Sequence, residues 1–257
     1  MAVPTPLAMK PLALLLALTV CACSAGPGPG LGTDPRVDPA DLAAIDLRPG
    51  ASEQAVPISD EFTLSFLLDV PDGIGSGRVP LVIAMPYAGD PVSSAREYFR
   101  LLAQPGLDGL GAVVVVPVAF TQTWETDIPV ETIASFVEAA AEAWPVDPDR
   151  VVVTGYSNGG NGSWAQAKRH PELFSAAIPM ASYAPTDPPT ALPLYIVHGE
   201  NDELFSVRRA RAAAEAAEAA GVLVEIETPP FAHFEAGRYV DVLARAATWV
   251  ETEVWAD

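Results

Sequence analysis

An almost continuously apolar run, "GAVVVVPVAF" at residues 111–120, lies in the middle of the chain and is rich in β-branched residues. Successive side chains of a strand point to opposite faces, so a strand of this composition needs cover on both sides. Such strands are typical of parallel sheets with helices on both faces. We therefore expect residues 111–120 to form a central strand of a sheet of this kind.

The rest of the chain alternates between strand-like and helix-like segments, which favours the same architecture. Strands are predicted at 61–70, 79–89, 150–155, 174–182, 192–199 and 222–228, and helices at 94–104, 131–144, 160–169, 207–220 and 235–250. "GIGSGR" at 73–78 predicts a hairpin turn between the first two of these strands. The link at 182–191 is short for an inserted lid. The predicted fold class is α/β, a mainly parallel central sheet with helices on both faces and no substantial lid domain.

The first residues resemble an export signal rather than part of a folded domain. Lys10 is the only charged residue before the apolar run "PLALLLALTV", which is short for a membrane-spanning helix. The run ends in "VCAC", which looks like a bacterial lipobox, where a cysteine after a small residue becomes lipid-modified. Cys23 after Ala22 fits better than Cys21 after a bulky valine. We expect residues 1–22 to be a lipoprotein-type signal peptide; an ordinary signal peptide without an anchor is the alternative.

The amino-acid composition predicts where the folded domain begins and which binding partners are unfavourable. Residues 23–59 are rich in Gly, Pro and Asp, which predicts a flexible tether, and residues 60–257 are expected to form one domain. Both cysteines, Cys21 and Cys23, precede that domain, so it cannot depend on disulfides. The formal charge of −19 becomes −20 when Lys10 is removed with the signal, and it argues against nucleic-acid partners. We expect an exported protein, lipid-anchored at the cell envelope or secreted.

A serine lies in a glycine-rich turn, "GYSNG" at 155–159, between a strand-like and a helix-like segment. The turn matches G-x-S-x-G, a motif in which glycines relieve crowding so that a serine can occupy a sharp turn with its hydroxyl exposed. The alternatives are a turn that binds a phosphate at a helix N-terminus, or merely a tight loop. The position between a strand and a helix favours Ser157 as a nucleophile.

A serine hydroxyl becomes a good nucleophile only with a histidine base that is itself held by a carboxylate. The sequence has three histidines. His170 is at the expected C-terminal end of a helix, where a histidine commonly serves the helix terminus, and His198 lies in a turn directly after a strand. His233 lies in the loop between the last strand and the last helix, on the reactive edge of such a sheet. We predict His233 as the base, with His170 and His198 as alternatives.

The carboxylate is expected from another loop at the same edge of the sheet. "HGENDELF" at 198–205 follows a predicted strand and contains three acidic residues. Asp202 is our candidate, whereas Glu200 and Glu203 are less favoured and could simply be solvated loop charges. Nucleophile, acid and base then come from three separate loops.

Longer stretches around these residues resemble a known superfamily. They are "VDPDRVVVTGYSNGGNGSWAQAKRHPELFSAAIPM", "LPLYIVHGENDELF" and "AHF". Together, over about residues 60–255, they resemble the esterase, polyhydroxybutyrate-depolymerase-like and predicted-peptidase (prolyl-oligopeptidase-like) branch of the α/β-hydrolase superfamily, in which the order is also Ser, Asp, His. The resemblance implies an α/β-hydrolase fold with Ser157 as nucleophile, His233 as general base and then general acid, and Asp202 orienting His233.

An acyl-transfer enzyme also needs an oxyanion hole, two N–H donors aimed at the carbonyl oxygen. The backbone N–H of Asn158, directly after the nucleophile, is one donor by position. The resemblance implies that Tyr87 supplies the second. Here the chain reads Met85-Pro86-Tyr87, where the family usually has His-Gly and a variable residue. Pro86 has no N–H, but the donor is expected from the residue after it.

The leading interpretation is a serine hydrolase that cleaves carboxylic esters through an acyl-enzyme intermediate, without a metal or an organic cofactor. Small or polymeric esters are the expected substrates, with strongly anionic ones disfavoured by the acidic surface. The side chains of Asn158, Trp124 and Trp164 are weaker candidates for the substrate pocket, because aromatic residues at such places more often serve packing. A peptidase of the same fold is one alternative, and a non-catalytic surface lipoprotein, motivated by the altered Met85–Pro86 loop, is the other.

Overall fold

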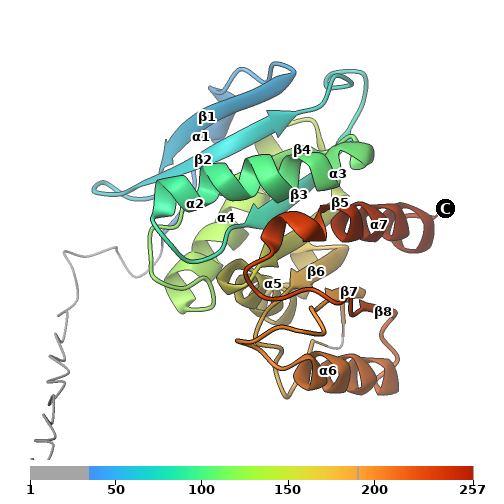
Figure 1. Ribbon diagram of the computed structural model, residues 1–257. Coiled ribbons are helices and arrows are strands. Elements are labelled where there is room, and N and C mark those ends of the chain that lie inside the picture. The colour runs from blue at the N-terminus through green and yellow to red at the C-terminus, as the bar shows by residue number, and fades with distance from the viewer. Residues whose placement is uncertain (1–34, 190, 257) are drawn as a thin grey trace, which may run out of the picture. The chain divides into compact units, whose positions relative to one another are not determined.

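The structure, a computed structural model, describes residues 35–189 and 191–256, and the strands of these residues form one eight-stranded sheet. Their order across the sheet is β1-β2-β4-β3-β5-β6-β7-β8 (Figure 1). The strands are β1 Gly50–Pro57, β2 Thr63–Val70, β3 Val79–Met85, β4 Val113–Pro117, β5 Val146–Tyr156, β6 Ala176–Met180, β7 Leu194–Val197 and β8 Val224–Glu227. Strands β3 to β8 run parallel, and β1 and β2 add an antiparallel hairpin at one edge. The predicted mainly parallel sheet is confirmed.

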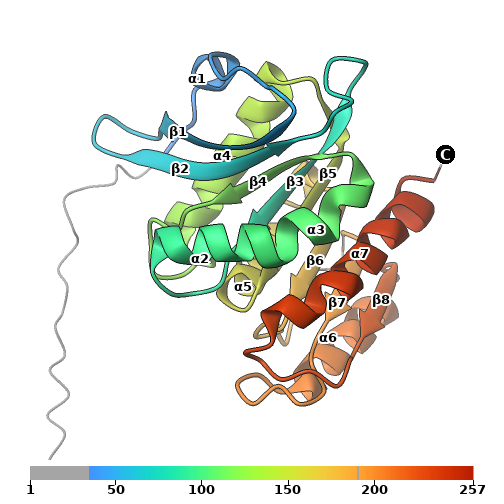
Figure 2. The same ribbon diagram turned by 45° about the horizontal axis from the view of Figure 1, so that its top comes forward.

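Helices cover both faces of the sheet (Figure 2). Helices α1, α4, α5 and α6 pack on one face, and α2, α3 and α7 pack on the other. The helices are α1 Pro39–Ala43, α2 Pro91–Tyr98, α3 Gln104–Leu107, α4 Asp127–Ala143, α5 Asn158–Arg169, α6 Val207–Ala219 and α7 Val240–Trp249, with shorter 3-10 or π turns at Phe99–Ala103, Asp108–Leu110, Pro171–Leu173, Ala236–Tyr239 and Val250–Val254. Along β3, Leu81 and Ile83 join the first core whereas Val82 and Ala84 join the second. No helix of the described residues is long and apolar enough to cross a membrane.

The first strands pair differently from the prediction. A hairpin turn is predicted at 73–78, but β2 and β3 are not neighbours, because β4 lies between them. Strand β2 runs antiparallel to β4, with Phe66 opposite Pro117. Strand β4 is buried at every position, so a place between two strands satisfies its backbone and leaves its two faces to the two cores. The hairpin prediction is therefore wrong, and the hairpin of this region is β1–β2, which closes at residues 58–62.

The folded part of the chain begins earlier than the sequence predicts. The prediction of a flexible tether at 23–59 is wrong from residue 35 onward, since α1 and β1 lie there. Leu42 is fully buried, and the indole N–H of Trp144 donates to its carbonyl oxygen at 2.9 Å. These short segments have no clear periodicity of their own; α1 is ordered by contacts with α4, which lies far away in the sequence, and β1 by pairing with β2. The predictions for residues 1–22 and Cys23 lie outside the described residues.

The loops that carry the predicted catalytic residues all leave the carboxyl ends of parallel strands. Ser157 follows β5, Asp202 lies beyond β7, and His233 lies beyond β8. In a parallel sheet these ends share one edge. The three loops therefore meet, although Ser157 and His233 are 76 positions apart in the sequence.

Candidate active site

Ser157 occupies a strained turn between the end of β5 and the start of α5. Its φ of 56° and ψ of −115° are rare for a residue that carries a Cβ. Its N–H donates to the carbonyl oxygen of Met180 on the neighbouring strand at 2.9 Å, and its own carbonyl accepts from the N–H of Asn161 at 3.0 Å. The turn is thus held from the sheet and from the helix. This is the strand–turn–helix geometry of the G-x-S-x-G motif.

Two glycines make this turn possible by leaving room for backbone contacts. A Cβ on Gly155 would lie 2.2 Å from the carbonyl oxygen of Gly159. A Cβ on Gly159 would in turn lie 1.9 Å from the carbonyl oxygen of Met85. Both distances are far below van der Waals contact, so neither position accepts a side chain without moving the backbone. The same packing brings the end of β3, and the loop with Tyr87, against the first turn of α5.

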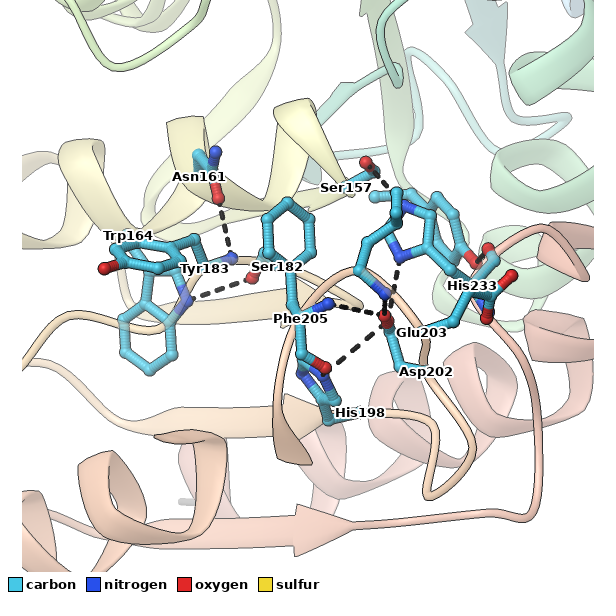
Figure 3. A network of polar contacts seen from close by, with 12 residues as sticks. Ser157, Asn161, Trp164, Ser182, Tyr183, His198, Asp202, Glu203, Phe205 and His233 are labelled. Atoms are coloured by element: carbon cyan, nitrogen blue, oxygen red, sulfur yellow. Dashed lines mark hydrogen bonds and ion pairs between the residues drawn. The ribbon is translucent and has the colours of Figure 1, made fainter. Parts of the chain in front are cut away.

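Figure 3 shows His233 between Ser157 and Asp202. Its Nε2 lies 2.9 Å from Ser157 Oγ, and its Nδ1 lies 2.8 Å from Asp202 Oδ2. A carboxylate only accepts hydrogen bonds, so in the neutral imidazole Nδ1 carries the proton. Nε2 is then free to accept from the serine hydroxyl. The structure therefore brings together the three residues that the sequence singles out as nucleophile, base and acid.

The Asp202 carboxylate is completely buried and engaged at both oxygens. Oδ1 accepts from the backbone N–H groups of Leu204 at 2.8 Å and Phe205 at 2.7 Å. Oδ2 accepts from His233. An aspartate that binds the N–H groups two and three residues on closes a local turn. These bonds compensate the burial of the charge and fix the plane of the carboxylate.

Two further contacts hold the backbone of His233. Glu203 Oε2 accepts from the N–H of His233 at 2.9 Å, and the hydroxyl of Tyr156 donates to its carbonyl oxygen. Burial raises the pKa of the Tyr156 hydroxyl, so this group stays protonated and remains a donor. Neither contact follows from the sequence. Glu203 looks like a solvated loop charge there, and no local pattern marks a tyrosine whose partner lies 77 positions away.

The other two histidines have different surroundings. His198 is 2% exposed, and its Nε2–H donates to the carbonyl oxygen of Phe205 at 2.9 Å while lying 3.6 Å from Asp202 Oδ2. Burial lowers the pKa of His198 below its usual 6.5, so its imidazole is neutral at pH 7. His170 lies at the C-terminal end of α5. Neither is hydrogen-bonded to the serine, so the histidine placed at the nucleophile is His233.

A cavity of 640 Å³ opens beside Ser157. It is lined by Tyr87, Ala88, Glu97, Leu101, Tyr156, Ser157, Leu204, His233, Phe234, Glu235, Ala236, Gly237 and Arg238. Most of these side chains are apolar or aromatic, and the one cation among them, Arg238, is paired with Glu235 at 2.9 Å. The volume is in the usual range for a small-molecule site. Among the described residues, no group of three or more His, Cys, Asp or Glu is arranged to hold a metal ion.

The two residues predicted to supply the oxyanion hole have different side-chain surroundings. Tyr87 lines the cavity, and its ring packs edge-on against Tyr156 at 6.2 Å between centroids. Burial, and next a hydrogen bond to Glu97, raise the pKa of its hydroxyl. Asn158 begins α5, where the first N–H groups have no partner inside the helix. Its side-chain amide donates to the carbonyl of Gln122 at 3.1 Å and does not line the cavity.

Neither of the two tryptophans predicted for the substrate pocket lines this cavity. Trp124 is 1% exposed, and its indole N–H donates to the carbonyl of Pro86 at 3.0 Å. Trp164 is 4% exposed, and its indole N–H donates to Ser182 Oγ at 3.1 Å. Both rings belong to the core on one face of the sheet. A buried indole whose N–H finds a partner serves packing, and Trp124 also braces the loop that carries Tyr87.

The fold and the site together define a class of protein. A mainly parallel sheet, a serine at a strand–turn–helix turn and a His–Asp pair in hydrogen-bond reach of it are the features of the α/β-hydrolases. The comparison with protein families is more specific, because residues 118–249, a little over half of the chain, match the dienelactone hydrolase family. The chain belongs to this family. The predictions of an α/β-hydrolase fold and of an ester-hydrolase class are confirmed.

Solved structures of the same fold include several esterases. A thermostable esterase is 20% identical with a TM-score of 0.63, over 77% of this chain and 62% of that one. Esterase 2 of Thermogutta terrifontis, solved phosphorylated by paraoxon, is 19% identical with a TM-score of 0.61, over 81% of this chain and 96% of that one. The S-formylglutathione hydrolase of Staphylococcus aureus is 14% identical with a TM-score of 0.62, over 78% and 98%. At these identities the likeness shows the fold. No curated protein matches the sequence.

Proposed function

We propose that the protein hydrolyses carboxylic esters with Ser157 as nucleophile, His233 as base and Asp202 as the acid that orients the base. The observation that carries the proposal is the unbroken hydrogen-bonded chain of these three side chains, which opens on the cavity at its serine end. The hydroxyl can lose its proton as it attacks, because the imidazole nitrogen beside it is free. Membership of the family supports the proposal, since a lactone is a cyclic ester.

In the first half-reaction the Ser157 oxygen attacks the ester carbonyl carbon while His233 Nε2 takes the hydroxyl proton. Asp202 stabilises the imidazolium through Nδ1–H. The N–H groups of Asn158 and Tyr87 bind the carbonyl oxygen as it becomes negative. His233 then gives its proton to the alcohol oxygen as the ester C–O bond breaks. The alcohol leaves, and the acyl group remains on Ser157.

In the second half-reaction water takes the place of the alcohol. His233 Nε2 removes a proton from the water as its oxygen attacks the acyl carbon. The same two N–H groups bind the oxyanion that forms. The intermediate then collapses, the carboxylic acid leaves, and the proton returns to the Ser157 oxygen. The chain's own side chains and one water complete the cycle.

The proposal is tested with 4-nitrophenyl acetate and a fluorophosphonate probe on the native protein and on Ser157→Ala. We expect ester turnover and one covalent adduct at Ser157 in the native protein, and a loss of about 10⁴-fold or more in kcat/KM in the variant, because the serine forms the covalent bond. Thermal unfolding of the variant should match that of the native protein. An organophosphorus probe is a suitable choice, since the Thermogutta terrifontis esterase was phosphorylated by paraoxon.

Two results of this experiment would point to other functions. Folded native protein without an adduct would favour a non-catalytic binding module. Faster turnover of peptide anilides than of 4-nitrophenyl esters would favour a peptidase, because the same three side chains can also cleave amides.

We also propose that the protein is exported and attached to a membrane by a lipid on Cys23. The support is the sequence alone: one positive charge, a short apolar run and a cysteine after a small residue. Bacteria that express the full chain with labelled palmitate should incorporate the label into the native protein and not into Cys23→Ala. Label that persists in this variant and disappears in Cys21→Ala would move the lipid to Cys21.

A further inference from the structure

Two exposed apolar side chains lie at the opening of the active-site cavity. In the described part of the chain, five large hydrophobic side chains are exposed, and the two most exposed are Leu204 at 54% and Phe234 at 76%. Both line the cavity beside His233, and we call them the apolar rim. The other three, Val92, Tyr183 and Leu223, do not line this cavity. Large apolar side chains that cluster on a surface commonly mark a binding site.

Both rim side chains belong to the loops that carry the acid and the base. Phe234 follows His233, and their rings lie 5.3 Å apart in an edge-on arrangement. Leu204 is fixed by its N–H, which donates to the buried Asp202 carboxylate. The loop of the acid and the loop of the base therefore each place one apolar side chain at the same opening.

The rim continues the wall of the cavity, where the one arginine among the described lining residues is paired with a carboxylate. Leu204 and Phe234 both line the cavity beside the nucleophile. Arg238, the cation of the lining, has Nη1 3.0 and 2.9 Å from the two carboxylate oxygens of Glu235. Glu97 adds a negative charge to the lining. The part of a ligand that extends from the cavity onto the rim should therefore bind more tightly when it is uncharged and apolar.

We propose that the apolar rim binds an uncharged hydrocarbon chain of the ester substrate, so that the enzyme favours esters whose acyl or alcohol chain extends out of the cavity. The inference rests on the proposed ester hydrolysis and names its substrate class. Each methylene of the substrate chain that moves from water onto the rim should multiply kcat/KM by about fourfold. The net charge of −19 disfavours the other occupants of such a surface, a second copy of this chain or an anionic membrane.

The test compares Leu204→Ala and Phe234→Ala with a matched control, Leu223→Ala. Leu223 is 45% exposed and accepts from the N–H of Leu194 at the start of β7, the end of that strand opposite to the Asp202 loop. One series measures kcat/KM for 4-nitrophenyl octanoate and acetate, and the other for octyl acetate and methyl acetate. We expect the long-to-short ratio to fall about tenfold in both rim variants in at least one series, and to stay within about twofold of native in the control.

The outcomes separate this inference from the proposed function. A ratio that equals the native value in both rim variants and in both series, with ester turnover intact, would overturn the inference alone. The same holds if light scattering shows a native dimer that dissociates in Phe234→Ala while the ratio is unchanged, because the rim then binds a second copy. A native protein that hydrolyses none of the four esters would overturn the proposed function. All variants replace exposed residues, so their thermal unfolding should match the native protein.

Discussion

The turn that carries Ser157 and the loops that carry Asp202 and His233 hold these three hydrogen-bonded side chains in place by different means. At the elbow, residues 155–160, backbone packs on backbone, and glycines leave the space for it. In the acid–base loops, residues 198–205 and 231–239, polar side chains bind backbone groups, as Glu203 does at the N–H of His233. The elbow depends on close packing of backbone against backbone, and the acid–base loops depend on hydrogen bonds from side chains.

Because of this difference, we expect substitutions in the two regions to change stability and activity in different ways. A methyl group added at the elbow meets carbonyl oxygens that cannot move independently, so the whole turn must shift and stability and activity fall together. In the loops a substitution removes one hydrogen bond of several, so the effect should be graded and should fall mainly on the rate. Substitutions in both regions therefore test whether the two depend on different interactions.

The largest effect in the loops is expected from Asp202→Asn. If the new amide oxygen keeps the two bonds from Leu204 and Phe205, the amide NH₂ faces His233 Nδ1 and favours the tautomer with the proton on Nε2. That nitrogen can then no longer accept the serine proton, and kcat should fall by on the order of 10⁴-fold with little change in thermal unfolding. Steady-state ester kinetics check this. A loss below tenfold would mean that Asp202 does not orient His233.

At the elbow we expect Gly159→Ala to lower stability and activity together. The added Cβ would lie 1.9 Å from the Met85 carbonyl oxygen, so α5 must move away from β3 and carry the N–H of Asn158 with it. We expect about 1–3 kcal/mol less stability in urea unfolding and about a hundredfold loss in kcat/KM. Gly109→Ala is the matched control, since no atom lies within 4 Å of its added Cβ. Loss of activity at native stability in Gly159→Ala would contradict the packing argument.

A smaller effect is expected at Glu203, which positions the base without contacting the serine. Glu203→Ala removes the acceptor of the His233 N–H, and kcat should fall about tenfold with KM nearly unchanged, because one hydrogen bond that orients the imidazole is lost. Glu203→Gln keeps an oxygen acceptor and should restore most of the rate. Glu200→Ala is the control in the same loop, since Glu200 pairs with Arg211. If the glutamine variant is as slow as the alanine variant, the carboxylate charge matters rather than the hydrogen bond.

The elbow could be predicted from the sequence because its physics is local. Glycines and a serine at fixed spacing, after a β-branched run, describe the backbone that they form, and the chain order of Ser157, Asp202 and His233 completes the pattern. Trp124 and Trp164, predicted for the substrate pocket, do not line the cavity beside Ser157, and here the physics is not local. Whether an indole lines a cavity or fills a core depends on distant segments, here Pro86 and Ser182, which the sequence around each tryptophan does not specify.

The support of the acid–base loops and the place of the first strands escaped prediction for the same reason. Glu203 and Tyr156 act on a histidine far away in the chain, and Leu42 of α1 is held by Trp144 at the end of α4. Strand β4 lies between β2 and β3 because a strand that is apolar on both faces needs to be buried. The turn-like sequence at 73–78 gives no information about this position. Local patterns indicate elements, whereas their partners depend on the assembled core.

The smallest effect is expected in the pH dependence of stability, through the buried His198. His198 faces the Phe205 carbonyl, Asp202 and His233, and burial holds its folded-state pKa below the 6.5 of the unfolded chain. As the pH falls below 6.5 the unfolded state takes up a proton that the folded state resists, so the contribution is fully present above that pH and is lost below it. Urea unfolding at pH 8, 6.5 and 5.5 should show a free energy of unfolding that falls by at most about 1.4 kcal/mol per pH unit from this group. His198→Gln keeps an N–H donor for Phe205 and does not titrate, so its curve should be flatter, and equal slopes in both proteins would remove His198 as the cause.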